Sequence, residues 1–429
     1  MSKRVVITGI GWVTPLGHDR ETVWENLLAG RSAIGPTQQF DASTYPTTFS
    51  AEVRDYDFRP WVRHPEAHEH AGPNTLFALG AARQAWTMAG LDESQPDLDR
   101  VGIYLGSGEG AQDFDNYTAT HLKGWDPEKN DIDMHRWLQA AKEHINMWRE
   151  SEQESNMTLS HLAVELEAAG PAYNCLTACA ASTQAIGEAT EMLRRGDADV
   201  MVSGGAHSMI HPLGVTGFNL LTALSERNDD PATASRPFNR TRDGFVLGEG
   251  SGMVILETLD HARARGAEPL AEVIGYGSSA DAYRITDIHP EGRGPVAAMR
   301  AAMAQAEIGP ADVDYISAHG TGTKENDSIE TRSIKTVFGE DAKKTPMSSI
   351  KSMMGHLIAA AGACELITCV LSIRDQKIPP TINLNEPDPD LDLDYVPNES
   401  RSADVRICLS NSFGFGGQND TLVIRRFEP

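Results

Sequence analysis

The chain has 429 residues, of which 40% are hydrophobic and 23% charged, a composition typical of a globular protein with two or three domain-sized units. A formal charge of −24 argues against a nucleic acid as partner, because phosphates attract basic surfaces. There is no run of about 18 apolar residues, so we expect no membrane insertion. Five scattered cysteines favour a reducing, cytoplasmic location over a disulfide framework.

Short β-branched segments alternate with alanine-rich amphipathic segments along the chain. We expect buried strands within 4–11, 100–108, 199–206, 252–257, 271–277, 314–322 and 406–417. We expect helices within 74–90, 181–196 and 294–309, and a further alanine-rich helix after residue 356. Several of the strands run directly into glycine turns, and the helices have a glycine at or just past their ends. This alternation predicts an α/β fold with largely parallel sheets.

Two pairs of segments indicate an internal duplication. Residues 4–17 resemble 271–283, and residues 197–207 resemble 312–322. Together they suggest two halves, 1–267 and 268–429, with the boundary after a glycine-containing linker.

The segment 111–157 is polar and does not fit the alternation. Within it, apolar residues keep helical spacing at Met134, Leu138, Ala141, Ile145 and Trp148. We expect a surface helix with one docking face.

Cys175 and Cys179 stand four residues apart, and four interpretations compete. Their spacing, and that of the distant Cys364 and Cys369, fits no familiar zinc site. A disulfide is not favoured in a reducing compartment. Buried packing is the simplest interpretation for Cys175, Cys364, Cys369 and Cys408. Cys179 differs, because it begins a predicted helix, where the positive end of the dipole favours a thiolate nucleophile.

Other reactive side chains occupy similar junctions. His319 follows a strand and precedes a glycine–threonine loop, and Lys351 and His356 precede an alanine-rich helix. A glycine-rich turn with Phe413 and Phe415 follows the last predicted strand. Junctions of this kind are where α/β folds collect functional residues.

These motifs resemble a known family. Cys179 in "TACAAS", His319 in "AHGTGT", Lys351 and His356 in "IKSMMGH", and the turn "NSFGFGG" are similar to those of the β-ketoacyl–acyl carrier protein synthases of the thiolase superfamily, and most of all to synthase II. The resemblance covers nearly the whole chain in order. It implies a thiolase-like five-layered α-β-α-β-α sandwich built from two duplicated halves, a homodimer, and an acyl carrier protein as partner.

The resemblance also implies a reaction, the decarboxylative condensation of an acyl thioester with malonyl–acyl carrier protein. Cys179 would carry the acyl group, with the backbone amides of Cys179 and Phe413 binding the oxyanion. His319 and His356 would stabilise the enolate, Lys351 would organise the site through Glu330, and Phe413 would gate the acyl pocket. The implied substrate contacts are Thr321 and Thr323 to the phosphopantetheine arm, and Glu109, Phe218, Phe415, Asp281 and Thr286. No metal and no cofactor beyond the carrier's phosphopantetheine is implied.

Several positions depart from the family pattern. Glu109 stands where an apolar residue is expected in the acyl pocket, so we expect a short or polar acyl group unless Glu109 faces solvent. The segment 62–74, where a basic docking surface is expected, carries His64, His68 and His70, and we expect a solvated loop. Thr222 replaces a docking arginine. The segment 111–157 is longer than its counterpart, either as a plain surface insertion or as a lid or partner site near the pocket mouth, since it follows Glu109 directly.

Two other functions compete with condensation. A non-catalytic partner subunit, like the chain-length factors, would lack the nucleophile, whereas Cys179, His319, Lys351 and His356 are all present. A degradative thiolase would use a second cysteine near the C-terminus, where this chain has "NSFGFGG". A thioesterase-type acyl transferase belongs to the same alternative.

Overall fold

The computed structural model describes residues 3–429. Ten strands are hydrogen-bonded in the order β12-β11-β15-β16-β10-β1-β9-β8-β4-β7, and the array divides into two five-stranded halves where β1 meets β10. The strands of the first half are β1 (Val5–Val13), β4 (Val101–Ser107), β7 (Ala172–Cys175), β8 (Val200–His207) and β9 (Gly250–Thr258). Those of the second are β10 (Ala271–Ala280), β11 (Tyr315–Ser317), β12 (Met347–Ser348), β15 (Ile407–Phe413) and β16 (Gln418–Arg426).

The two halves have the same topology. From the outer edge inward, β7, β4, β8, β9 and β1 correspond to β12, β11, β15, β16 and β10. The resemblance between 4–17 and 271–283 is therefore correct, since it matches β1 with β10. The resemblance between 197–207 and 312–322 is wrong, because it matches β8 with β11, whose true counterpart is β4.

The sheets are mixed, so the prediction of largely parallel sheets is wrong. β4 is parallel to β7 and β8, and β11 is parallel to β12 and β15. The remaining pairings, which involve β9, β16 and the β1–β10 junction, are antiparallel. The physical reason is clearest at β15 and β16, since the four residues between them are too few for the crossover that a parallel pair needs.

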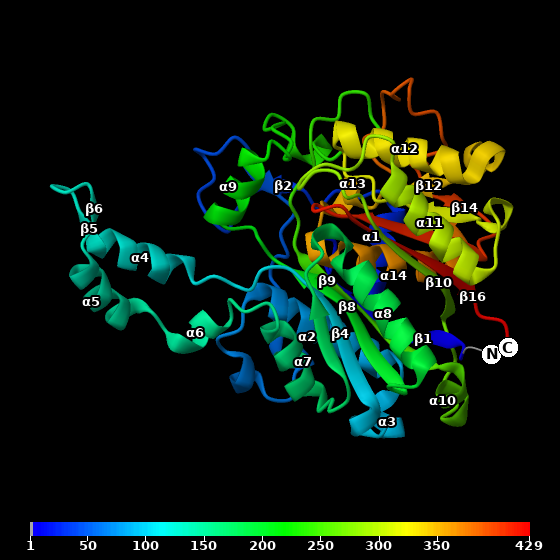
Figure 1. Ribbon diagram of the computed structural model, residues 1–429, viewed down its shortest axis with the longest axis horizontal. Coiled ribbons are helices and arrows are strands. Elements are labelled where there is room, and N and C mark those ends of the chain that lie inside the picture. Colours follow the sequence, from blue (N-terminus) through cyan, green and yellow to red (C-terminus); the bar gives the residue numbers. More distant parts are fainter. Residues whose placement is uncertain (1–2) are drawn as a thin grey trace.

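Helices form three layers, one on the outer face of each half-sheet and one between the two half-sheets (Figure 1). The central helices α8 (Ala181–Arg195) and α14 (Ala361–Asp375) contact strands of both halves and each other. The helices α2 (Pro73–Met88) and α7 (Met157–Leu166) cover the first half, and α11 (Arg293–Ala306) and α12 (Lys324–Phe338) cover the second. The predicted five-layered α-β-α-β-α sandwich is confirmed.

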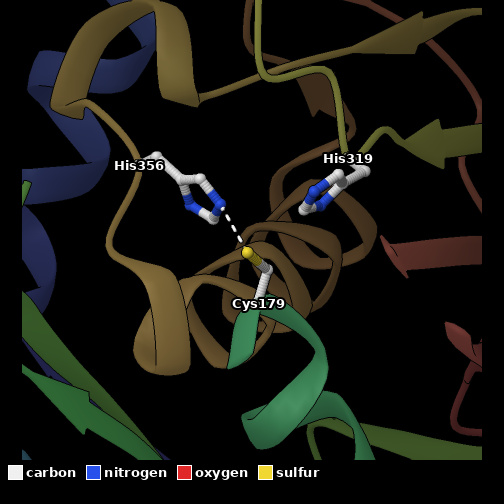
Figure 2. A group of neighbouring side chains, drawn as sticks. All are labelled: Cys179, His319 and His356. Atoms are coloured by element: carbon white, nitrogen blue, oxygen red, sulfur yellow. Dashed lines mark hydrogen bonds between the residues drawn. The ribbon is translucent and has the colours of Figure 1, made fainter. Parts of the chain in front are cut away.

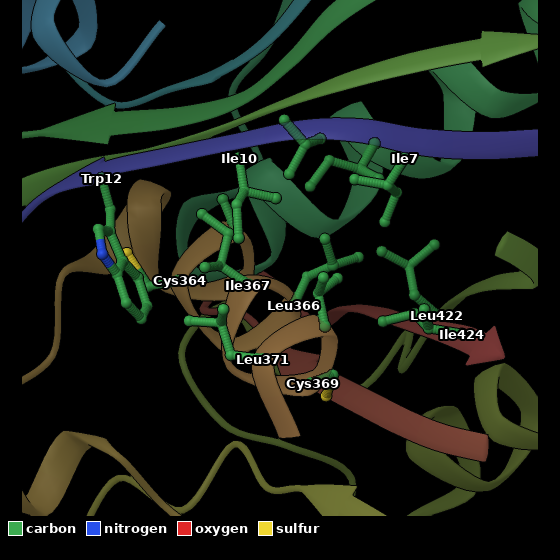
Figure 3. Packing of buried hydrophobic residues seen from close by; sticks show 14 of the residues in the cluster. Ile7, Ile10, Trp12, Cys364, Leu366, Ile367, Cys369, Leu371, Leu422 and Ile424 are labelled. Atoms are coloured by element: carbon green, nitrogen blue, oxygen red, sulfur yellow. The ribbon is translucent and has the colours of Figure 1, made fainter. Parts of the chain in front are cut away.

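The central layer is packed from both sides. Residues 361–373 of α14 are all buried, as expected for a helix enclosed between two sheets. Figure 3 shows its side chains, Leu366 and Ile367 among them, against Ile7 of β1 and Leu422 of β16. Helices α8 and α14 meet at Gly362, where an added Cβ would lie 1.9 Å from Thr183 Oγ1, so no larger residue fits there without movement.

A helical arm extends from the body between β4 and α7 (Figure 1). It consists of α4 (Phe114–Gly124), the short strands β5 (Trp125–Asp126) and β6 (Asp131–Ile132), α5 (Met134–His144) and α6 (Met147–Ser151). The prediction of one surface helix is therefore only partly correct. Met134, Leu138 and Trp148 are 65%, 49% and 61% exposed, so their apolar face is not buried within the described chain.

The remaining elements are short. They are α1 (Arg20–Leu28), α3 (Leu91–Ser94), α9 (Pro212–Leu220), α10 (Leu259–Ala264), α13 (Lys351–Met354), β2 (Gly35–Pro36), β3 (Phe49–Ser50), β13 (Lys377–Ile378) and β14 (Arg401–Ser402). Among the helices of residues 3–429, none has the length and apolar character needed to cross a bilayer.

Candidate active site

Cys179 lies in a strained turn at the start of the central helix α8. A single 3₁₀ turn, Ala178–Ala180, joins directly to the helix, and Ala178 has a φ of +48°. The other half repeats this turn before α14, over Ile358–Ala360, with a φ of +44° at Ile358. A left-handed backbone conformation at a non-glycine residue raises the free energy of the folded chain. The surrounding packing holds this conformation in both turns, the one before α8 and the one before α14. The thiol thus sits where the two halves meet.

Cys179, His319 and His356 come together at this junction (Figure 2). His319 follows β11 and His356 follows α13, and all three side chains are buried. The Cys179 Sγ lies 3.0 Å from His356 Nε2, and the two imidazole rings are 5.4 Å apart with an interplanar angle of 83°. One ligand atom from each of the three residues lies within 4.8 Å of the others.

Hydrogen bonds determine which nitrogen of each imidazole carries the proton. The backbone N–H of Ile358 donates to His356 Nδ1 at 3.2 Å, and the Lys351 ammonium, which can only donate, lies 3.5 Å from His319 Nδ1. Both rings therefore carry hydrogen on Nε2 when neutral. Burial lowers the pKa of both imidazoles well below the ordinary histidine value, and the Lys351 ammonium lowers both further. The site has two neutral N–H donors, rather than the free nitrogen lone pairs that a metal ion would need.

Lys351 pairs with Glu365 and not, as predicted, with Glu330. Its ammonium forms an ion pair with Glu365, on α14, and donates to the His319 carbonyl at 2.7 Å. Glu330 accepts instead from the backbone N–H groups of His319 and Gly320, each at 2.8 Å. Burial raises the pKa of Glu330 to about 7. Both carboxylates thus hold the segment that carries His319, one through its backbone and the other through Lys351.

The thiol of Cys179 is protonated at rest, contrary to the prediction from its position at a helix start. Burial raises its pKa to about 11, although the backbone amides of Phe415 and Cys179 and the Lys351 ammonium all lower it. The amide that approaches the sulfur beside its own is therefore that of Phe415. The predicted amide, that of Phe413, is wrong, because Phe413 is still part of β15. Its ring packs 5.7 Å from that of His319.

A cavity of about 670 Å³ opens over the three residues. The predicted residues that line it are Cys179, Thr286, His319, Thr321, Thr323, His356, Phe413 and Phe415. Thr321 and Thr323 share a hydrogen bond of 3.0 Å between their hydroxyls. Phe218 lies beside the cavity, in the apolar cluster that contains Cys179.

Other predicted residues lie outside the cavity wall. Asp281 is buried beneath the glycine-rich turn, where its N–H donates to the Gly417 carbonyl at 2.8 Å. Lys351 and Glu330 lie behind His319. Glu109 is exposed on the loop after β4, and the structure does not bring it to Cys179. This is the alternative left open by the sequence, in which Glu109 faces solvent, so the expectation of a short or polar acyl group, which held only for a carboxylate inside the acyl pocket, does not apply.

The segment 62–74 is the predicted solvated loop only in part, since Arg63, His64, Glu66 and Glu69 are exposed whereas His68 is not. His68 is buried, with its Nδ1 2.8 Å from Nδ1 of His161 and its Nε2 3.3 Å from the Glu165 carboxylate. His64 is exposed beside Glu66. The error arose because the buried partners of His68, which are His161 and Glu165, lie on α7, far from 62–74 in the sequence.

A thiol facing two neutral imidazoles, at the junction of two duplicated halves, defines a condensing enzyme of the thiolase fold. Two family models match the chain: "Beta-ketoacyl synthase, N-terminal domain" over residues 2–262 and "Beta-ketoacyl synthase, C-terminal domain" over residues 270–385. The chain belongs to the β-ketoacyl synthase family.

Individual proteins resemble the chain over its full length. The 3-oxoacyl-[acyl-carrier-protein] synthase 2 of Coxiella burnetii is 43% identical over 99% of both chains. The ishigamide ketosynthase/chain length factor is 33% identical and covers 100% of both chains, with a TM-score of 0.89. A type II PKS ketosynthase, solved with its acyl-carrier protein and bound to the hexaketide, is also 33% identical over 100% of both chains, with a TM-score of 0.87.

The thiol pKa values predict how the cysteines react. Burial raises the pKa of Cys179 to about 11 and that of Cys175 to about 12, and Cys179 is the one of the two that lines the cavity and has an imidazole N–H beside its sulfur. Iodoacetamide labelling, followed by peptide mass spectrometry, should modify Cys179 first. Its rate should rise about tenfold per pH unit between pH 7 and 9. A rate that is flat over this range, or faster modification of Cys175, would show that the thiol is not in the state described.

Proposed function

We propose that the protein condenses an acyl group with malonyl–acyl carrier protein, releasing carbon dioxide and forming a β-ketoacyl–acyl carrier protein. The observation that carries this proposal is the pair of neutral Nε2–H donors facing a thiol at the bottom of a cavity. Donors fixed in advance stabilise negative charge as it develops on a substrate oxygen. A hydrolase or a thiolase would need a base at this position, and both imidazoles have their protons on the side facing the thiol.

The first half-reaction loads the enzyme. The Cys179 sulfur attacks the carbonyl carbon of an acyl thioester, and the thiol of the carrier leaves with the proton that Cys179 gives up. The amides of Cys179 and Phe415, which already approach the sulfur, bind the oxyanion. Charge at the sulfur is supported by the His356 N–H, 3.0 Å away, and by the ammonium of Lys351.

The second half-reaction forms the carbon–carbon bond. The carbon–carboxylate bond of the malonyl thioester breaks, carbon dioxide leaves, and the electron pair remains as an enolate whose oxygen accepts from His319 and His356. The enolate carbon attacks the acyl carbon on Cys179, the sulfur leaves as a thiolate, and one proton from solvent restores the thiol. The atoms balance without any redox or metal step, so we propose that no cofactor takes part beyond the carrier's phosphopantetheine.

Other residues position the reacting groups. Thr321 and Thr323 line the cavity above Cys179, where we propose that their hydroxyls bind the phosphopantetheine arm. The position of His319 depends on three residues that lie outside the cavity wall: Lys351, Glu365 and Glu330. Gating of the acyl pocket by Phe413, the substrate contacts of Phe218, Asp281 and Thr286, and the cytoplasmic location stay predictions.

We also propose that two copies of the chain form a homodimer. β7 ends the order of strands, so its outer edge has no partner strand within residues 3–429. Tyr173 within β7 and Leu176 just after it are 56% and 53% exposed. An open edge flanked by apolar side chains is usually covered, and a second copy of β7 would cover it with two-fold symmetry. The exposed apolar face of the arm supports the same assembly.

Histidine variants should separate the two half-reactions. His319→Ala and His356→Ala should each slow malonyl decarboxylation by about 100-fold or more, because each removes a donor to the enolate oxygen. Acylation should survive better in His319→Ala, since, of the two imidazoles, His356 is the one with a hydrogen bond to the sulfur. Mass spectrometry measures both, as conversion of malonyl to acetyl carrier protein and as the acyl adduct on Cys179.

His64→Ala, at an exposed histidine, is the matched control and should behave like the wild type. If both catalytic-site variants decarboxylate at the wild-type rate, the two imidazoles do not have the proposed role. Retention of full condensation by Cys179→Ala would remove the nucleophile from the mechanism.

The dimer can be measured directly. Light scattering should give about twice the chain mass of 46.6 kDa, and Tyr173→Asp should shift the mass toward that of one chain, because a symmetric interface brings the two new charges together. Val164→Asp, at a residue 62% exposed on α7, is the control. A wild-type mass of one chain would contradict the proposal.

A further inference from the structure

A row of four side chains joins parts of the first half that are far apart in the sequence. The Glu165 carboxylate lies 3.3 Å from His68 Nε2, and His68 Nδ1 lies 2.8 Å from His161 Nδ1. The other nitrogen of His161, Nε2, lies 3.0 Å from the Glu152 carboxylate. Glu165, His68 and Glu152 are buried, and the His161 side chain is 12% exposed. None of the four lines the cavity over Cys179, so the proposed reaction leaves the row unexplained.

The row connects the base of the arm to the body of the protein. His161 and Glu165 lie on α7, and His68 ends a short 3₁₀ turn. Glu152 follows α6 at the end of the arm (Figure 1), and its carbonyl accepts from the N–H of Ala111, where the arm begins, at 2.9 Å. The four side chains thus join both ends of the arm and the 3₁₀ turn to α7.

The hydrogen bonds of the row determine how many protons it holds. An ionised carboxylate only accepts, so His68 and His161 each carry a hydrogen on Nε2. The two Nδ1 atoms then face each other at 2.8 Å, where two lone pairs repel and a third hydrogen completes an N–H···N hydrogen bond. Two neutral imidazoles carry only two hydrogens on nitrogen. The complete row therefore holds one proton more than two neutral histidines and two carboxylates.

The surroundings place the extra charge on His161. Burial lowers the pKa of His68, and a charged His161 lowers it further, while the Glu165 carboxylate opposes both. His68 is therefore the neutral ring, which accepts at Nδ1, and His161 is the imidazolium, which donates from both nitrogens. Its counter-ion is Glu152, at 3.0 Å, as a largely buried charge requires.

Carboxylates dominate the charges that face the row. Besides Glu152 and Glu165, Glu66 favours the charged form of His68. Hydrogen bonds between α2 and α7 near the row join uncharged side chains, those of Asn74, Thr75 and Thr158. Other charged groups of the adjoining segments form their own ion pairs, His70 with Glu69, Arg63 with Glu167 and Arg149 with Asp113. The surplus of carboxylates favours a bound proton.

A metal ion explains the row less well than a proton. Two nitrogens bound to one tetrahedral zinc ion are about 3.3 Å apart, farther than the 2.8 Å between the Nδ1 atoms of His68 and His161. Glu152 and Glu165 face the opposite ring nitrogens, so they would add no ligand. Two ligands fall short of the four that zinc takes.

We propose that the row is a pH-sensitive clamp, in which one proton shared by His68 and His161 joins the arm and the 3₁₀ turn to α7. At alkaline pH the open row gives up this proton, and closing it would bring two lone pairs together. At acidic pH each ring of the open row takes up its own proton, one more than the closed row accepts. The clamp is therefore strongest near pH 6.5, the ordinary value for a free histidine, and weakens on both sides.

Hydrogen exchange measured by mass spectrometry tests the clamp in the full chain. The protection of peptides that cover 62–72 and 147–165, corrected for the intrinsic effect of pH on exchange, should be greatest near pH 6.5. It should fall by about tenfold or more from pH 6.5 to 8.5 and by about threefold from pH 6.5 to 5.5, as the linkage of one proton requires. Peptides from α14, which contains no part of the row, should show no such maximum.

Variants show which side chains hold the proton. In His161→Gln, protection should stay flat from pH 7 to 8.5, because an amide takes up no proton and His68 is neutral whether the row is open or closed. Glu152→Gln should shift the alkaline loss of protection to lower pH, because the imidazolium loses its counter-ion. His64→Gln, at an exposed histidine beside Glu66, is the matched control and should keep the wild-type maximum.

Three results would overturn the proposal. The first is wild-type protection that does not change between pH 5.5 and 8.5. The second is an alkaline loss of protection that is unchanged in His161→Gln and Glu152→Gln, and Glu152→Gln alone decides if His161→Gln does not fold. The third is a loss of wild-type protection at pH 6.5 on adding EDTA, restored by zinc chloride, which would assign a metal ion to the space between the two Nδ1 atoms.

Discussion

Lys351 places an ammonium group in the interior, 2% exposed, where water cannot solvate it. Its ion pair with Glu365 and its hydrogen bond to the His319 carbonyl provide the compensation that a buried charge requires. Removing one partner of such a pair commonly costs about 3–5 kcal/mol. The charge also acts on its surroundings, because it adds to burial, the main cause, in lowering the pKa of both His319 and His356. This one group thus connects the position of His319 with the protonation state of both imidazoles.

In the proposed mechanism, neutral imidazoles give the site its selectivity between steps. An imidazolium would protonate the enolate and end the reaction before the carbon–carbon bond forms, whereas a neutral N–H donates a hydrogen bond and keeps its proton. The backbone of Ile358 and the ammonium of Lys351 also fix the orientation of the two rings. The resting thiol has a pKa of about 11. The hydrogen-bond donors around its sulfur are in place before any charge develops on the sulfur.

The sequence was sufficient for the fold class and the three central residues, because each lies in a motif at a strand or helix junction. The sequence was insufficient where the contacts of a side chain involve a partner that is distant in the sequence. Glu365 was missed although it is a lone carboxylate in the apolar segment "AAAGACELITCVLSI". A charge in such a segment needs a buried partner, and Lys351 is the cation in the neighbouring motif, so that signal could have found the pair.

Other errors arose from local geometry. The amide near the sulfur belongs to Phe415 because β15 continues through Phe413. The glycine-rich sequence does not show where this strand ends. The short strand β12 and the strand β16 were not predicted, since β12 is too brief to show periodicity and β16 begins with polar residues. The match of 197–207 with 312–322 followed composition, whereas strand order decides which segments are equivalent.

The central claim is that both imidazoles are neutral and carry their hydrogen on Nε2. Neutron crystallography of the deuterium-exchanged protein at pH 7 observes these hydrogens directly. The account predicts density for one deuterium on Nε2 of His319 and of His356, none on either Nδ1, and three on the Lys351 nitrogen. Density on Nδ1 of His356, or on both nitrogens of either ring, would contradict it.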